Sequence, residues 1–457
     1  MCQQDEKFTS VHTSGGTSLR PMTESRRFYL ETLGCPKNQV DSDKITGSML
    51  ADGMVATDDP ALADVVVVNT CAFIDEARRE SIDTILALDD RRKPSSQLVV
   101  TGCMAERYGE ELAAALPEVD RVAGFGVAIE PPRTRTLIPV TEAPLPTFDL
   151  LNLPRPASIR PWAYVKVAEG CNRSCGFCAI PSFRGPQRSR DVASIIAEVE
   201  TLDVREVVLV AQDLASYGTD RPADLGAGSI VPLVKAVGAL VDRVRLLYLY
   251  PSDLNDTLID VMLDSGVPYF DLSLQHVSKP LLRRMRRWGD GERFLERITT
   301  IRSREPDAAL RSNFIVGYPG ETERDHDELL QFVEDAQLDW CGFFSFSPEE
   351  GTHAMTLDGH VPESLISERL GELRELQDAI TAERRDALIG RQLSVLIDEP
   401  GIARSHFEAP EIDGVIHVDT TLDVGSIVSV DIMDANGPDL IAVGGFVPDD
   451  PDAAMMS

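Results

Sequence analysis

Three cysteines stand close together near the middle of the chain, at Cys171, Cys175 and Cys178. Thiolates are preferred ligands of both zinc and iron–sulfur clusters, so the ligand type alone does not choose between them. A structural zinc ion takes four protein ligands, and neither a histidine nor a fourth cysteine lies near this run. The spacing therefore favours an iron–sulfur cluster that lacks one protein ligand, whose open iron can bind a substrate or cofactor. Structural zinc is the alternative.

A second set of cysteines, Cys35, Cys71 and Cys103, is spread along the N-terminal part. Each lies just beyond a short apolar run of the kind that forms a parallel strand. These runs cover residues 28–30, 65–69 and 98–101. Ligands bind at the carboxyl edge of such sheets, so we expect the three thiols to converge there. The alternative is three unrelated buried cysteines, since free cysteine is often buried.

The two remaining cysteines have no such setting. We interpret Cys2 as incidental and Cys341, which precedes an apolar strand candidate, as part of the core. Disulfides are not expected in a chain of intracellular character.

The elements that must position the cysteines alternate between strand and helix. Up to residue 142, the apolar runs alternate with helix-like segments at 43–52, 76–88 and 106–116, which predicts an open parallel α/β sheet. Residues 162–391 repeat the alternation with six strand candidates, which predicts a partial TIM-like (β/α)6 barrel. From residue 392, apolar and polar residues alternate at period two, which predicts a small all-β barrel of the oligonucleotide-binding-like kind.

The predicted fold class is therefore α/β multidomain. The predicted parts are a disordered leader (1–25), an N-terminal domain (26–142), a linker (143–156), a central barrel (157–388) and a terminal β-barrel (389–457). The leader has no apolar core typical of a secretory signal. No apolar run approaches the roughly 20 residues that a bilayer requires. We expect a cytoplasmic protein without a membrane partner.

Several residues fall just beyond the predicted strands of the central barrel. Gln212, Asp213 and Gln275 stand at such ends, and Gly317 and Gly320 lie in a glycine-rich turn. The carboxyl ends of barrel strands carry the reactive groups, and glycine permits close approach of the backbone to a ligand. We predict that these five residues bind a cofactor.

Of the seven histidines, His276 also lies at a strand end. A functional histidine and a satisfied core histidine fit this position equally well. The sequence contains no Ser-His-Asp set and no phosphate-binding loop, so no catalytic residue is assigned.

The central cysteine run, with Phe177 directly before its third cysteine, resembles the CxxxCxxC signature of the radical S-adenosylmethionine (SAM) superfamily. The resemblance implies a [4Fe–4S] cluster on Cys171, Cys175 and Cys178, whose open iron chelates SAM. It also implies that cleavage of SAM releases a 5′-deoxyadenosyl radical. The turn at residues 314–321 resembles the superfamily's segment beside the adenine of SAM.

The three-part organisation from Arg27 to Phe446 resembles the methylthiotransferase family. This resemblance implies a second [4Fe–4S] cluster on Cys35, Cys71 and Cys103, whose open iron holds the sulfur to be inserted. It further implies that SAM serves both as methyl donor and as radical source. A reductant such as flavodoxin or ferredoxin is expected as a partner.

The family has a branch that modifies tRNA (MiaB type) and a branch that modifies an aspartate of small-subunit ribosomal protein twelve (RimO type). The local motifs resemble the second branch. They are LGCPKN at 33–38, NTCAFI at 69–74, IPSFRG at 180–185, YLYP at 248–251 and SPEEGT at 347–352. The last of these is acidic where a tRNA-modifying enzyme is expected to be basic.

The charge balance favours the same branch. The formal net charge is −31, and residues 391–457 contain two basic and 13 acidic residues. Such a barrel would repel tRNA phosphates and suits a basic protein surface, although acidity can also serve solubility alone.

The resulting hypothesis is a transferase of sulfur-containing groups. It inserts a methylthio group at the β-carbon of an aspartate of ribosomal protein twelve by a radical mechanism, and direct tRNA binding is disfavoured. A tRNA methylthiotransferase acting on isopentenyladenosine is one alternative. A non-catalytic, metal-stabilised binding module is another.

Overall fold

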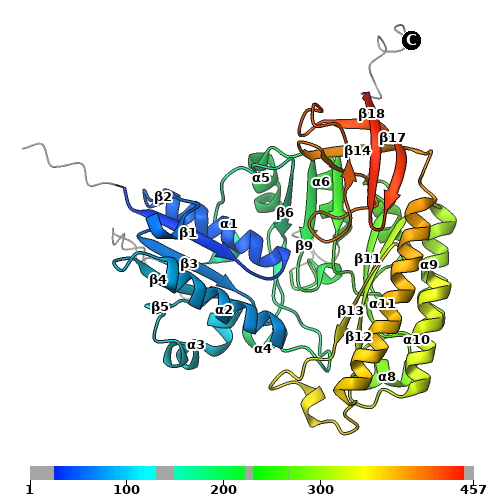
Figure 1. The fold of residues 1–457 in the computed structure, drawn as a ribbon, viewed down its shortest axis with the longest axis horizontal. Coiled ribbons are helices and arrows are strands. Elements are labelled where there is room, and N and C mark those ends of the chain that lie inside the picture. Colours follow the sequence, from blue (N-terminus) through cyan, green and yellow to red (C-terminus); the bar gives the residue numbers. More distant parts are fainter. Residues whose placement is uncertain (1–24, 130–148, 222–229, 266, 447–457) are drawn as a thin grey trace, which may run out of the picture.

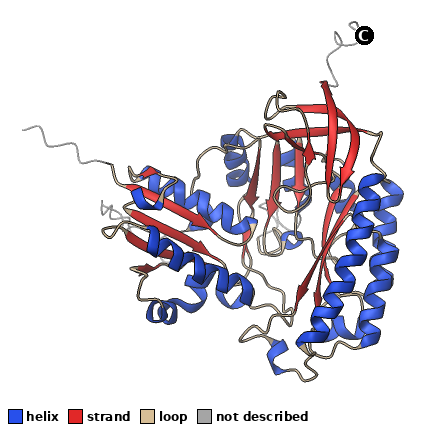
Figure 2. Cartoon of the chain, in the orientation of Figure 1, coloured by secondary structure: helices blue, strands red, loops and turns tan. Residues whose placement is uncertain are grey.

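The computed structural model describes residues 25–129, 149–221, 230–265 and 267–446, which form three parts (Figure 1). An α/β layer comes first, a larger array of strands and helices follows, and a closed β-barrel ends the chain (Figure 2). The predicted fold class is confirmed. Cys2, most of the predicted leader and part of the predicted linker lie outside the described residues.

The first part is a parallel sheet with the strand order β2-β1-β3-β4-β5. Its strands are β1 (Arg27–Thr32), β2 (Val55–Ala56), β3 (Val65–Thr70), β4 (Gln97–Gly102) and β5 (Arg121–Val122). Its helices are α1 (Pro36–Ala51), α2 (Asp75–Arg91) and α3 (Cys103–Ala115). Strand β3 is buried throughout, as expected of a central strand covered on both faces.

Helix α1 begins earlier than the predicted start at residue 43. Its first residue is Pro36, whose missing amide and fixed φ suit the first turn of a helix. The edge strands β2 and β5 were not predicted, because two residues are too few to show a periodic pattern.

The central part contains six parallel strands in two groups, β6-β9-β10 and β11-β12-β13. They are β6 (Trp162–Lys166), β9 (Glu206–Val210), β10 (Arg243–Leu246), β11 (Tyr269–Gln275), β12 (Ala309–Val316) and β13 (Trp340–Ser345). A parallel bridge between Leu249 and Leu272 joins the groups. Among the described strands, β6 and β13 do not pair, so the barrel is open, as predicted.

Helices cover the outside of this array (Figure 1). They are α5 (Val192–Leu202), α6 (Ile230–Gly238), α7 (Asp256–Leu263), α8 (Lys279–Arg284), α9 (Gly291–Arg304), α10 (Glu323–Ala336) and α11 (Glu363–Asp386). Between β6 and α5, the chain forms the strand pair β7 (Ala168–Glu169) and β8 (Arg188–Ser189) around helix α4 (Ile180–Arg184). No helix among the described residues is long and apolar enough to cross a bilayer.

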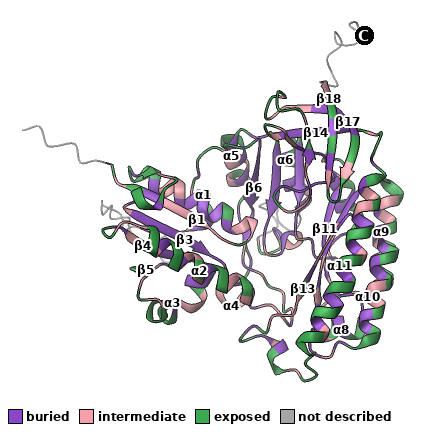
Figure 3. Cartoon of the chain, in the orientation of Figure 1, coloured by how far each residue is buried: buried purple, intermediate pink, exposed green. Residues whose placement is uncertain are grey.

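Strands β6 and β9 of the central part are buried throughout (Figure 3), whereas β13 is buried only in part. Val207 and Leu209 pack in the cluster that includes the covering helices. Val208 packs instead with Val40 of α1 and with Val395 of the terminal barrel. The other two parts of the chain therefore close the open array through one shared hydrophobic cluster.

The terminal barrel is closed, with the strand order β14-β15-β16-β18-β17. Its strands are β14 (Gln392–Glu399), β15 (Ile402–Arg404), β16 (Ile416–His417), β17 (Ile427–Asn436) and β18 (Asp439–Phe446). Buried charges join it to the central part: Glu206 accepts from Arg245 Nε at 2.8 Å and from Arg404 Nη1 at 3.2 Å. Burial alone would raise the pKa of Glu206, but the two arginine charges lower it to about 2.

Candidate functional site

The cysteines of the N-terminal trio (Cys35, Cys71 and Cys103) lie at the carboxyl edge of the first sheet. Cys35 caps α1, Cys71 follows β3, and Cys103 is the first residue of α3. A Cβ on Gly34, which has a φ of 94°, would lie 2.9 Å from the Cys71 sulfur, so the residue before Cys35 contacts Cys71. Burial, together with the charges of Cys35 and Cys103, raises the pKa of Cys71 to about 12. The three cysteines therefore lie close enough for the charges of Cys35 and Cys103 to act on Cys71, and their shared role as ligands stays a prediction.

Positive charge and amide groups surround the N-terminal trio. Arg184 Nη2 donates to the Cys103 sulfur at 2.9 Å and to Asn38 Oδ1 at 2.8 Å. Asn38 in turn donates to the Thr70 carbonyl at 3.0 Å, directly before Cys71. Burial opposes ionisation of Cys35, but the charges of Lys37 and Arg184 lower its pKa. These charges favour the thiolate of Cys35, whereas burial raises the pKa of Cys71 and of Cys103.

The central trio (Cys171, Cys175 and Cys178) lies in the loop after β7. The Cys178 amide donates to the Cys175 carbonyl at 3.2 Å, and the Arg287 Nη1 donates to the Cys175 sulfur at 3.2 Å. Burial is the main cause that raises the pKa of Cys178 to about 12, and the charges of Cys175 and Cys171 contribute to the same rise. The sulfurs of Cys175 and Cys171 therefore lie close enough to act on Cys178.

Packing fixes the backbone of this loop at Gly176. Its amide donates to the Met285 carbonyl at 2.7 Å, and its carbonyl accepts from the Ala354 amide at 2.8 Å. A Cβ at this position would lie only 2.7 Å from the Tyr318 hydroxyl. Glycine is therefore required here for close approach.

The two cysteine trios can be compared with the ligand sets of a zinc ion and of an iron–sulfur cluster. Among the described residues, no three side chains of histidine, cysteine, aspartate or glutamate meet closely enough to hold a single metal ion. In an iron–sulfur cluster, each thiolate binds a different iron, so its sulfurs do not converge on one point. Three thiolates are the donor set that a [4Fe–4S] cluster with one open iron requires, and the presence of a cluster at either trio stays a prediction.

A buried polar network lies between the two trios. Arg184 Nη1 donates to Glu169 Oε1 at 2.7 Å, and Gln212 Nε2 donates to the same oxygen at 2.7 Å. Lys166 donates to the other oxygen of Glu169 at 2.7 Å. Burial would raise the pKa of Glu169, but the charges of Arg184 and Lys166 hold it well below its usual range. Glu169 stands two residues before Cys171, and Arg184 contacts Cys103 of the N-terminal trio. The Arg184–Glu169 ion pair therefore links the two trios.

Gln212 and Asp213 each have one side-chain oxygen that is free to accept a hydrogen bond from a ligand. Gln212 Oε1 and Asp213 Oδ1 are buried and have no hydrogen-bond partner among the described residues. The other Asp213 oxygen accepts from Arg173 Nε at 2.6 Å, in the cysteine loop. Buried acceptors without partners are costly unless a ligand completes them. The predicted role of these two residues in cofactor binding thus fits their surroundings.

The remaining predicted cofactor residues have local explanations. Gln275 ends β11 at a register shift with a φ of 73°. Gly317 and Gly320 have φ values of 85° and 92°, and a Cβ at Gly317 would collide with Ile366. At Gly320, a Cβ would lie 2.8 Å from Arg284 Nε. The packing of the chain alone therefore requires both glycines, and their contact with a cofactor stays a prediction.

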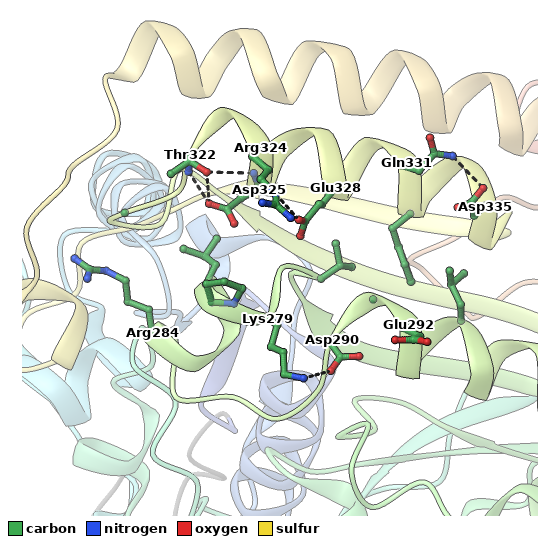
Figure 4. Close-up of a pocket in the computed structure, with 17 residues that line it drawn as sticks. Lys279, Arg284, Asp290, Glu292, Thr322, Arg324, Asp325, Glu328, Gln331 and Asp335 are labelled. Atoms are coloured by element: carbon green, nitrogen blue, oxygen red, sulfur yellow. Dashed lines mark hydrogen bonds and ion pairs between the residues drawn. The ribbon is translucent and has the colours of Figure 1, made fainter.

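Gly320 also lines a pocket between α8, α9 and α10 that contains none of the cysteines (Figure 4). Two ion pairs lie among its lining residues, Lys279 with Asp290 at 3.3 Å and Arg324 with Glu328 at 3.1 Å. A third cation of the lining, Arg284, pairs with Asp358 outside it.

His276 and Cys341 lie within the fold rather than in an open site. His276 is fully buried; its Nδ1 accepts from the Ser278 amide at 3.1 Å, and its Nε2 has no hydrogen-bond partner among the described residues. Cys341 is half-buried in β13 and packs against the main hydrophobic cluster.

Glu349 has a structural role. It belongs to the acidic segment at residues 347–352. It is buried, and its Oε2 accepts from Arg78 Nη1 and Arg107 Nη1, both at 2.6 Å. Arg78 lies on α2 and Arg107 on α3, so one carboxylate fastens both helices to the central part. Sequence reasoning missed this pairing, and also missed Arg184 and Arg287, because each joins residues far apart in the chain.

Three family profiles match the chain. They describe an uncharacterized protein family (UPF0004) over residues 27–124, the radical SAM superfamily over 165–333, and a TRAM domain over 389–444. The radical SAM superfamily uses a [4Fe–4S] cluster together with SAM, as the resemblance of the central cysteine run implied.

Similar curated proteins cover the chain almost from end to end. The ribosomal protein uS12 methylthiotransferase RimO of Cutibacterium acnes is 42% identical, over 91% of this chain and 97% of its own. The RimO protein of Anaeromyxobacter sp. (strain Fw109-5) is 41% identical over 94% of both chains, and that of Moorella thermoacetica is 42% identical over 86% and 93%. Among solved structures, the radical SAM methyltransferase TsrM of Kitasatospora setae is 14% identical and covers 83% of this chain and 80% of its own with a TM-score of 0.44. From that likeness we draw nothing. The identities and coverage of the curated relatives show that the chain belongs to the RimO family of ribosomal protein uS12 methylthiotransferases.

Proposed function

We propose that this protein attaches a methylthio group to the β-carbon of an aspartate of ribosomal protein uS12. The relatives described above carry this activity in their names. The structural observation that carries the proposal is the pairing of two cysteine trios across the Arg184–Glu169 ion pair. An enzyme that inserts sulfur needs a sulfur-bearing site and a radical-generating site close together.

The two trios have separate tasks in this proposal. The central trio would hold the [4Fe–4S] cluster that works with SAM, and the N-terminal trio would hold a second [4Fe–4S] cluster. When bound, the first supplies the electron that cleaves SAM to a 5′-deoxyadenosyl radical, and the second supplies the sulfur. Radical chemistry is required because the C–H bond at an aspartate β-carbon is too weakly acidic for a side-chain base.

Residues around the central trio hold the loop and the cofactor. The guanidinium groups of Arg173 and Arg287 lie 4.1 Å and 4.3 Å from the ring centroid of Tyr250, in cation–π contact. Arg173 also pairs with Asp213, and Arg287 with Cys175. The free oxygens of Gln212 and Asp213 would accept N–H groups of SAM.

The terminal barrel has the charge that a basic protein substrate requires. Arg404 is 2% exposed and adds nothing to the surface. The exposed carboxylates of the described barrel are Glu399, Glu411, Asp419, Asp423, Asp431 and Asp434. Complementary charge raises the association rate and sets the orientation of the partner, whereas tRNA would be repelled.

The proposal includes a one-electron donor protein such as flavodoxin or ferredoxin and a cytoplasmic location, where a ribosomal protein substrate is made. Both follow from the proposed reaction and its substrate.

A labelling experiment tests the proposal. Anaerobically reconstituted holoprotein is incubated with a reductant and with SAM that carries a labelled methyl group, and either uS12 or tRNA is added. We expect the label in an aspartate-containing peptide of uS12, detected by mass spectrometry, together with about eight irons per chain. Label in tRNA alone, or a protein that binds zinc and no iron, would overturn the proposal.

A further inference from the structure

Lys37 differs from the neighbouring cations at the contact between the N-terminal and central parts. Arg184 and Lys166 both pair with the buried carboxylate of Glu169. Lys37 is half-buried and makes no ion pair among the residues that the structure describes. Its Nζ lies instead 3.5 Å from the ring centroid of Tyr248. Its charge also acts on Cys35 and on Asp271. Because none of the described carboxylates forms an ion pair with it, this ammonium can still accept an anion.

The Tyr248 ring is held firmly in place. Tyr248 follows β10 and has a φ of 66°, a conformation that costs energy for a residue with a side chain. Its amide donates to Asp271 Oδ2 at 2.9 Å, which fixes the backbone. Asp271 Oδ1 lies 3.8 Å from Arg311, and the charges of Arg311 and Lys37 both act on this buried carboxylate, although Lys37 forms no ion pair with it.

Lys37 and Tyr248 border the same space as the first cysteine of the N-terminal trio. Lys37 stands two positions after Cys35 at the start of α1. After burial, the charge of Cys35 is the largest influence that raises the pKa of Tyr248. The ammonium, the phenol ring and the sulfur therefore lie together where α1 meets the open barrel.

We infer that Lys37 binds the side-chain carboxylate of the substrate aspartate. The inference rests on the proposed function and names one contact within it. A half-buried ammonium lacks part of its hydration, and a carboxylate would replace it with a charge-assisted hydrogen bond. The β-carbon is bonded directly to that carboxylate, so this contact holds the β-carbon beside the Cys35 side of the trio. An adenosine substrate carries no carboxylate, so the same contact favours protein over tRNA.

The test compares two substrates and three variants of the holoprotein. The substrates are uS12 and uS12 in which the target aspartate is replaced by asparagine. The variants are Lys37→Met, Lys37→Arg and, as a control for the loss of one positive charge, Arg283→Met on the exposed face of α8. Dissociation constants are measured by titration, and the iron and sulfide content of each variant is measured in parallel.

We expect Lys37→Met to weaken binding of the aspartate substrate about tenfold, the size of effect typical of a charge-assisted contact. The same variant should bind the asparagine substrate as tightly as the wild type does. Lys37→Arg should keep most of the affinity for the aspartate substrate, and Arg283→Met should change neither constant.

Three outcomes would overturn the inference. They are an equal loss for both substrates, no loss for either, and loss of iron from Lys37→Met, which would assign Lys37 to holding the cluster. Failure of the proposed function looks different, because the wild-type holoprotein would then neither bind nor modify uS12.

Discussion

The guanidinium of Arg184 donates a hydrogen bond to the sulfur of Cys103 across 2.9 Å, although 81 residues separate them in the sequence. Arg184 is the last residue of α4 in the central part, and Cys103 is the first residue of α3, directly after strand β4 of the first sheet. This contact joins the carboxyl edge of one parallel sheet to that of another, where each sheet presents its cysteines. Its removal should therefore affect both the stability of the chain and the environment of the N-terminal trio.

Replacing Arg184 by methionine tests this contact. Buried Glu169 would lose a partner, and the loss of one partner from a buried ion pair costs about 3 kcal/mol. We expect a comparable decrease in the free energy of unfolding, measured by denaturant titration, and weaker retention of iron. Arg184→Lys keeps the charge without the planar donor fork, so it should recover part of the stability. Unchanged iron content in Arg184→Met would contradict a role beside the cluster.

Replacing Cys35, Cys71 and Cys103 together by alanine tests the second cluster. If each trio holds one [4Fe–4S] cluster, the iron content should fall from about eight to about four per chain. The matched variant, with alanine at Cys171, Cys175 and Cys178, should lose a similar amount. Iron and sulfide analysis after anaerobic reconstitution measures both. An iron content in the first variant equal to that of the wild type would show that the N-terminal trio holds no cluster.

Gly176→Ala tests the packing of the central cysteine loop. The added Cβ would lie 2.7 Å from the Tyr318 hydroxyl, and overpacking of this kind costs about 1–3 kcal/mol. We expect a lower unfolding midpoint in denaturant. Tyr318→Phe removes the clashing oxygen, so the double variant should regain part of the stability lost by Gly176→Ala alone. Additive effects of the two substitutions would show that the hydroxyl is not the obstacle.

His276 should make stability depend on pH. Burial lowers its pKa from 6.5 to about 4, so the unfolded chain binds a proton at pH values where the folded chain does not. The stabilising effect is complete above about pH 6.5 and is lost as the pH falls toward 4, by about 3 kcal/mol at most. Denaturant midpoints at pH 7.5 and 5 measure this loss. The difference between them should shrink in His276→Gln and remain in His417→Gln, whose side chain is exposed.

The sequence was most informative where the signal is local. The apolar runs before Cys35, Cys71 and Cys103 predicted parallel strands, and the strand-end rule then predicted that the three thiols meet. The six strands of the open barrel and the closed terminal barrel were predicted from the same kind of pattern. The three-residue strand β15 (Ile402–Arg404) was missed because it is too short to show a period.

Contacts between distant segments could not be predicted in this way. Nothing near Arg184 in the sequence indicates that it pairs with Glu169 and with a cysteine of another sheet. The acidic segment at 347–352 was interpreted as a sign of the substrate, yet Glu349 is buried between Arg78 and Arg107. Composition shows that a charge is present, whereas only the folded chain shows whether that charge faces a partner or holds two helices together.

The buried charges beneath the terminal barrel limit how substrate recognition can be studied. Arg404 pairs with Glu206 of the central array, so deleting the terminal barrel would remove one of the two arginines that pair with this buried carboxylate and would expose Val208, which packs in the same cluster as the barrel. Loss of activity in such a shortened enzyme would therefore reflect a disrupted core as well as lost substrate contacts. Reversing the charge of exposed residues such as Glu399 and Asp419 leaves the buried contact between the barrel and the central part unchanged, so it measures the contribution of the outer surface alone.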